Sequence, residues 1–239
     1  IKYSPSYFNE LIWSKGEVIK PHFAFDSYFN TQRIDNSIDF SAKIGDIRYL
    51  KILAAYNIYE RKKNTYYKNL HTLNENLTPN PGDQDTTVFD ALNFRGELSK
   101  SDDDQNFNYQ FGIDINYETG HGEKIEDKDQ QIGDYAAYLS LKLNPISTFT
   151  LQPGIRFIYN TKYNAPLVYS LNLKWDPMEH TTLRASYSRG FRAPSLKELY
   201  LYFVDVNHDI LGNSDLKAED SHNVLLSMSY HNEAGKANF

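Results

Sequence analysis

Apolar and polar residues alternate along most of the chain. In residues 107–117 every odd position is apolar or aromatic, and every even position is polar or glycine. Successive side chains of a β-strand point to opposite faces, so this period of two predicts a strand with one apolar face. The pattern recurs strongly at 135–143, 149–159 and 167–175, and more weakly at 34–44, 47–59, 89–99, 181–189 and 224–230. The sequence therefore predicts an all-β protein with about nine readable strands, and with room for another in the first 30 residues.

The connections between these segments alternate in length. Short polar turns are expected at 45–46, 100–105, 144–147, 176–181 and 231–235, and longer loops at 61–88, 121–130, 162–165 and 190–218. This alternation predicts an antiparallel up-and-down meander whose two ends differ. In a membrane barrel the longer loops belong on the extracellular side and the short turns on the periplasmic side.

Alternation alone leaves two interpretations of the apolar face. It could line the core of a soluble antiparallel sheet, or it could face lipid. Three features favour lipid. The strands have about 10–13 residues, longer than the usual 5–6. The polar face carries charges in mid-strand, such as Arg95 and Asp114, and aromatic residues such as Tyr117 and Trp175 lie at the ends of the apolar stripes. We therefore predict a transmembrane β-barrel, with a soluble β-sandwich that binds a ligand or carbohydrate as the alternative.

Composition and motifs argue against several classes of function. The 239 residues carry a net charge of −6 with no basic cluster, which argues against nucleic acid as a partner. The chain has no cysteine, and it has no nucleophile elbow, HExxH motif or phosphate-binding loop. The acidic run at 101–105 lacks the spacing of a calcium loop. We expect neither an enzyme nor an intrinsic metal or cofactor site.

Residues 190–218 break the alternation. Gly190 loosens the preceding strand, and Pro194 fixes φ and removes a hydrogen-bond donor, so the strand must end there. The next six residues, "SLKELY", have helical spacing, and Ser195 with Glu198 resembles a capping box. We expect a short helix here. We also expect the Arg192 guanidinium to pair with a carboxylate and hold the loop against the wall.

Two parts of this insert resemble the barrel signature of TonB-dependent outer-membrane receptors. The first box is "GFRAPSLKELYLYF", and the second box, about 20 residues later, is "GNSDLKAEDSHNV". The matching residues are Phe191, Arg192, Ala193, Pro194, Ser195, Glu198, Leu199, Tyr200, Gly212, Asn213, Leu216, Lys217 and Glu219. The second box lacks the proline that the family often has there.

The resemblance implies that residues 1–239 form one partial barrel domain of about 9–11 strands, taken from a 22-stranded barrel in the bacterial outer membrane. We expect both chain ends to be truncations, with the N-terminal plug and the remaining strands outside this chain. The implied function is import of a scarce nutrient (haem, a ferric siderophore or cobalamin), with a glycan importer as the alternative. The implied partners are the TonB complex, reached through the plug, the nutrient and outer-membrane lipid.

The resemblance also suggests ligand-binding residues. Haem receptors of this family carry a histidine between the two boxes, where this sequence has His208, and a neutral imidazole is a good axial ligand for haem iron. A hydrated turn residue is the alternative for His208. Tyr200, Tyr202 and His121 are further candidates, although His121, between two glycines, also fits a flexible loop. The box residues Phe191, Arg192, Ala193, Pro194, Asn213 and Leu216 are expected to be structural.

Overall fold

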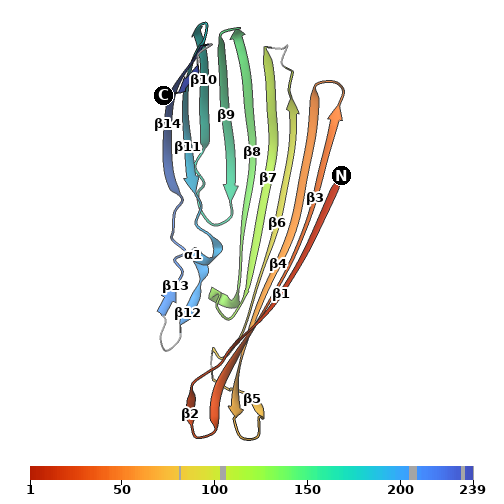
Figure 1. Ribbon diagram of the computed structural model, residues 1–239, viewed down its shortest axis with the longest axis vertical. Coiled ribbons are helices and arrows are strands. Elements are labelled where there is room, and N and C mark those ends of the chain that lie inside the picture. The colour runs from red at the N-terminus through yellow and green to blue at the C-terminus, as the bar shows by residue number, and fades with distance from the viewer. Residues whose placement is uncertain (81, 103–105, 205–208, 233–234, 239) are drawn as a thin grey trace.

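The chain forms one large antiparallel sheet. The computed structural model describes residues 1–80, 82–102, 106–204, 209–232 and 235–238. Its main sheet has 13 strands, and the strand order β1-β3-β4-β6-β7-β8-β9-β10-β11-β14-β15 follows the chain (Figure 1). The path strands are β1 (Lys2–Ser14), β3 (Phe23–Ile44), β4 (Arg48–Asn69), β6 (Gln84–Lys100), β7 (Phe107–Gly122), β8 (Asp129–Ile146), β9 (Phe149–Asn160), β10 (Val168–Met178), β11 (Thr181–Arg192), β14 (Glu219–Asn232) and β15 (Gly235–Asn238). The predicted antiparallel meander is confirmed.

Short elements gather at one end of this sheet. Strands β2 (Val18–Lys20) and β5 (Glu75–Leu77) pair with β3 and β4, and β12 (Tyr202–Val204) and β13 (Asp209–Leu211) form a separate hairpin. Helix α1 (Leu196–Tyr200) and a 3-10 turn (Glu126–Lys128) lie at the same end, which is the lower one in Figure 1. We call it the long-connection end, and the opposite one the short-turn end. No helix in the described residues is long and apolar enough to span a membrane.

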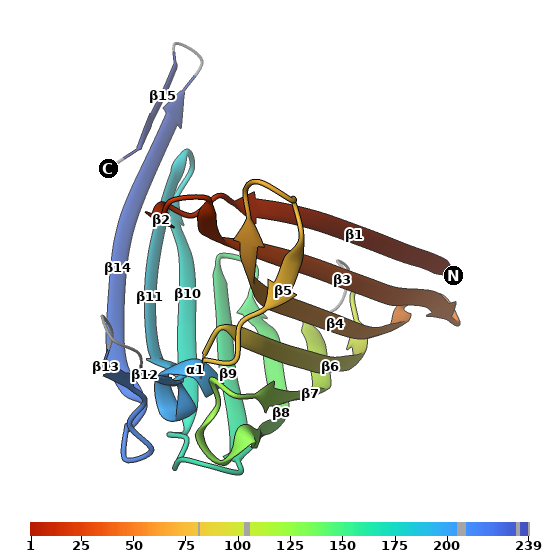
Figure 2. The same cartoon turned by 90° about the horizontal axis from the view of Figure 1, so that it is seen from below.

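The sheet is curved and open. Figure 2 shows β1 and β14–β15 as its two lateral edges, well apart from each other. Within the described residues no pairing joins β1 to β14 or β15. The sheet therefore has the form of a curved wall with two edges.

The apolar side chains lie on one face of this wall and are exposed. Phe157 is 60% exposed, and Phe111, Leu139 and Leu171 are also exposed. The second sheet in the described residues is only the β12–β13 hairpin, so no opposing layer covers these side chains. The soluble β-sandwich alternative is therefore wrong for this fold, because a sandwich buries these faces against each other.

Several strands extend further than the sequence predicts. Strands β3 and β4 have 22 residues each, and the segment 61–88, predicted to be a loop, contains the end of β4, all of β5 and the start of β6. Residues 61–69 are polar on both faces, so no hydrophobic period marks them as a strand, yet each of them pairs with β3. Backbone pairing extends this hairpin beyond the apolar stripe, together with cross-strand ring contacts such as Phe23–Tyr67 and Tyr28–Tyr66.

Candidate functional site

Helix α1 begins at a complete capping box. The backbone N–H of Glu198 donates to Ser195 Oγ at 3.3 Å, and the backbone N–H of Ser195 donates to Glu198 Oε2 at 2.8 Å. These two bonds satisfy amide groups that a five-residue helix otherwise leaves without partners. The predicted helix and its capping box are confirmed.

One face of α1 packs on the inner side of β7 and β8. Leu196, Leu199 and Tyr200 are 2%, 1% and 9% exposed. They form a buried apolar group that we call the insert cluster: Leu196, Leu199, Tyr200, Ile125, Ile132 and Tyr163. Phe191 and Ala193 of the first box pack against it. Burial of apolar surface therefore holds the insert on the wall.

An ion pair adds to this attachment. Arg192 Nη2 lies 2.5 Å from Glu198 Oε1, and Arg192 Nη1 lies 3.7 Å from Glu219 Oε1. The capping bonds from Ser195 and the neighbouring Arg192 charge lower the pKa of Glu198. Arg192 thus connects the first box to α1 and to the start of β14. The predicted pairing of its guanidinium with a carboxylate is confirmed.

The second box closes over the end of α1 through its backbone. Gly212 N donates to Leu201 O at 2.6 Å, and Asn213 N donates to Glu198 O at 2.9 Å. A Cβ on Gly212 would lie 2.5 Å from Leu199 O, so a side chain at this position would clash with the helix. The two boxes are thereby held together as one unit.

The connection between β9 and β10 supports the same unit. Tyr163 Oη donates to Asp134 Oδ1 at 3.0 Å, and Asn160 Oδ1 accepts from the Lys162 and Tyr163 backbone amides. Burial and the nearby Asp134 charge raise the pKa of Tyr163 well above its ordinary value. Lys162 Nζ lies 4.8 Å from the centre of the Tyr200 ring. Neither Tyr163 nor Ile125 is marked by the alternating pattern, because both lie outside the alternating segments.

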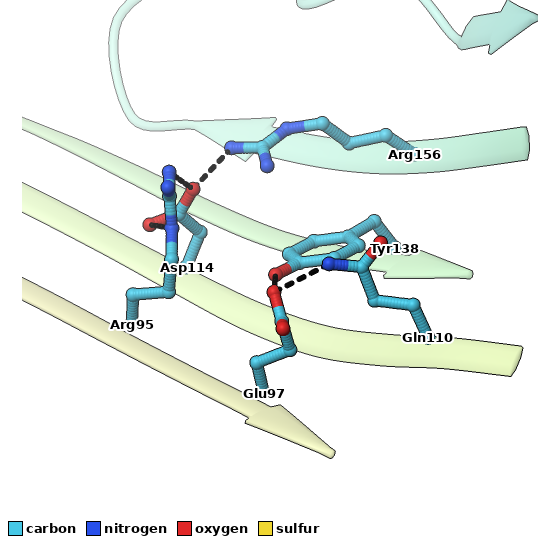
Figure 3. Close-up of polar contacts among 6 residues, drawn as sticks. All are labelled: Arg95, Glu97, Gln110, Asp114, Tyr138 and Arg156. Atoms are coloured by element: carbon cyan, nitrogen blue, oxygen red, sulfur yellow. Dashed lines mark hydrogen bonds and ion pairs between the residues drawn. The ribbon is translucent and has the colours of Figure 1, made fainter. Parts of the chain in front are cut away.

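The inner face of the wall next to this unit carries a polar network, drawn in Figure 3. Arg95 Nη2 and Arg156 Nη2 contact the same oxygen, Asp114 Oδ2, at 2.7 and 3.0 Å. Beside them, Gln110 Nε2 and Tyr138 Oη donate to Glu97 Oε2 at 2.6 and 3.0 Å. These four charged side chains therefore all have polar partners across β6 to β9.

A shallow pocket joins this network to the insert. Its lining includes Arg95, Asp114 and Arg156 from the wall, and Tyr163, Phe191 and Ala193 from the insert and its support. Its lining combines charged and apolar side chains, as ligand pockets commonly do.

The structure separates the predicted ligand-binding residues. His208 lies outside the described residues. Tyr202 on β12 is 49% exposed, whereas Tyr200 packs in the insert cluster. His121 lies in β7 rather than in a loop, and its Nδ1 is 3.1 Å from Asp129 Oδ1. Its neighbour Gly120 packs against Leu196 on the inner side, so His121 points to the outer face.

These residues therefore form no shared site in the described part of the chain. No group of three or more potential metal ligands occurs among the described residues either. Ligand binding by Tyr200, Tyr202 and His121 stays a prediction.

Comparisons with known proteins place the chain in a family. Residues 3–239 match the family model "TonB dependent receptor-like, beta-barrel". A hemoglobin and hemoglobin-haptoglobin-binding protein A of Haemophilus influenzae is 39% identical over 82 residues, which are 34% of this chain and 8% of that protein. The hemoglobin-haptoglobin utilization protein B of Neisseria meningitidis serogroup C is 31% identical over 96 residues, 40% of this chain and 12% of that protein.

Solved structures match nearly the whole chain. The siderophore receptor PirA of Pseudomonas aeruginosa aligns with a TM-score of 0.58 at 16% identity, over 98% of this chain and 51% of that one. The FrpB iron transporter of N. meningitidis aligns with a TM-score of 0.58 at 14% identity, over 99% of this chain and 43% of that one. At these identities the likeness shows the fold, and the chain spans about half of the solved receptors or less. The chain belongs to the TonB-dependent receptor-like β-barrel family, which consists of outer-membrane transporters and not of enzymes.

Proposed function

We propose that this chain forms part of the wall of an outer-membrane receptor that imports haem. The folded insert supports a receptor role, because it fixes two boxes of the chain on the inner face at the long-connection end. The choice of haem rests on one observation: relatives 31–39% identical over parts of the chain are named for the binding or utilization of haemoglobin or haemoglobin–haptoglobin. Energy would come from the TonB complex through a plug, which we propose lies outside residues 1–239.

His208 remains our candidate for the haem-iron ligand. It lies between the two boxes, in the segment that joins β12 to β13. The strands on either side of it, β12 and β13, pair with each other, and both boxes are anchored to the wall. A ferric siderophore or cobalamin receptor would use the same wall, and the solved siderophore receptors share only its fold.

Growth assays test this proposal. The full-length receptor would be expressed in an iron-starved host that lacks its own haem receptor, and supplied with haemin, haemoglobin or a ferric siderophore as the sole iron source. We expect growth on haemin, with loss of haem binding in His208→Ala. His222→Ala is the matched control, because the His222 ring bonds to Tyr187 on the wall. Growth on the siderophore alone would contradict the choice of haem.

A further inference from the structure

Two histidines lie side by side at the short-turn end of the wall. His180 occupies the turn between β10 and β11, and His231 lies near the end of β14. Their ring centres are 5.3 Å apart, and the ring planes are inclined by 86°. Both residues are exposed, and in the described part of the chain the ion pairs that involve histidine are those of His121.

The backbone holds the two residues in this arrangement. His231 N donates to His180 O at 3.0 Å, and Thr181 pairs directly with Tyr230 in the sheet. His180 itself has a φ of 70°, which is uncommon for a residue with a side chain. The rings therefore project from fixed points and not from a loose tail.

The spacing of the rings suits a shared metal ion. An imidazole nitrogen binds Zn²⁺ at about 2.0–2.1 Å, which puts the ring centre about 3.2 Å from the ion. When one nitrogen of each ring faces the same ion, two rings with centres 5.3 Å apart subtend about 112° at that ion, close to the tetrahedral angle. We propose that His180 and His231 form a two-histidine site for a divalent transition-metal ion of the zinc type.

A second histidine pair offers an internal comparison. His22 and His71 lie at the far tip of the long-connection end, with ring centres 5.9 Å apart. The same reasoning gives an angle of about 134°, which is far from tetrahedral. Zn²⁺ is therefore expected to prefer the His180 and His231 pair over the His22 and His71 pair.

The proposed site is open. No third metal-binding residue joins either pair within the described residues. Water or a donor from a partner would complete the coordination, as at zinc sites that keep an exchangeable position. The ion is therefore expected to exchange readily with solution.

Calorimetric titration with ZnCl₂ tests the proposal, using the full-length receptor in detergent. The variants are His180→Asn, because asparagine tolerates positive φ, and His231→Gln. Each is expected to weaken the tightest Zn²⁺ site about tenfold or more, since each removes one of two protein ligands. The control His22→Asn/His71→Gln, with asparagine at position 22 because its φ is 76°, is expected to leave that site unchanged. Heat-modifiable gel migration would verify that every variant folds.

Substitution with Co²⁺ adds a readout of geometry. A four-coordinate ion gives strong visible absorption, and the two variants are expected to remove it while the His22/His71 control keeps it. Wild-type receptor that binds no Zn²⁺, or unchanged Zn²⁺ affinity in the His180→Asn/His231→Gln double variant, would overturn the proposal.

Discussion

The ring of Tyr138 lies across Gly112, its neighbour on the adjacent strand, and reaches Glu97 one strand further on. A Cβ at position 112 would lie 2.3 Å from Tyr138 Cζ, so only glycine fits beneath the ring. The Tyr138 hydroxyl donates to Glu97 Oε2 at 3.0 Å (Figure 3). One side chain thus connects β6, β7 and β8 on the inner face of the wall.

Replacing Gly112 by alanine is expected to displace the Tyr138 ring and break its bond to Glu97. Overpacking of this kind costs about 1–3 kcal/mol. Urea unfolding of the full-length receptor in detergent would measure the loss. Gly96→Ala is the matched control, because a Cβ there has its nearest atom at 3.5 Å, an ordinary contact. Equal stability of the two variants would contradict this explanation.

The insert cluster is expected to depend on Leu199, which is 1% exposed. Leu199→Ala leaves a cavity beneath α1, which costs about 2–5 kcal/mol. We expect the insert to become sensitive to protease in outer-membrane vesicles, while the strands stay protected. Leu211→Ala removes the same atoms from a side chain that is 60% exposed, and should change little. Similar cleavage of both variants would show that the cluster does not anchor the insert.

The capping box predicts a dependence on pH. The pKa of Glu198 lies below its ordinary value of 4.5 because the Ser195 bonds and Arg192 favour the carboxylate. Its contribution to insert stability is therefore present above about pH 4.5 and is lost as the pH falls through the lowered pKa. Pepsin sensitivity of the insert should rise in acid for the wild type. Above about pH 4.5, the Glu198→Gln insert should be more sensitive than the wild-type insert, and its sensitivity should change less with pH. Wild-type and Glu198→Gln sensitivities that change in parallel with pH would refute this role of Glu198.

Asp114 is expected to matter more than other acidic residues of the wall. Asp114→Asn leaves two guanidiniums, Arg95 and Arg156, without their shared carboxylate, and loss of charged hydrogen bonds costs about 1–3 kcal/mol. Asp35→Asn is the comparison, because Asp35 pairs with the exposed Arg33, and such pairs contribute about 0–1 kcal/mol. Denaturant unfolding would compare them, and a larger effect at Asp35 would contradict the ranking.

The alternating pattern predicted the wall well, because a strand that separates lipid from a polar interior must alternate. It also located the insert, because β11 ends at Arg192, two residues before Pro194; Gly190, however, still pairs with Ser221 and does not loosen the strand as predicted. It failed where alternation is absent: the polar end of β4 was predicted to be a loop, and β7 continues through His121 to Gly122.

The site was harder to predict from sequence. The partners of α1 come from distant connections: Ile125 precedes β8, and Tyr163 follows β9. Such contacts depend on how the strands stack side by side, which residue spacing does not encode. The capping box and the Arg192 pairing were predictable because their groups lie within six residues of one another.

Our account of this fold makes one main claim about the wall: its apolar face contacts lipid and its charged face does not. Spin labels on single cysteines at positions 157 and 156, in the full-length receptor in outer-membrane vesicles, test it directly. Phe157 is 60% exposed on the apolar face, and the adjacent Arg156 contacts Asp114 on the inner face. We expect the label at 157 to be relaxed by lipid-soluble oxygen, and the label at 156 by a water-soluble nickel chelate. The reverse pattern, or access of the chelate to both labels, would contradict the claim.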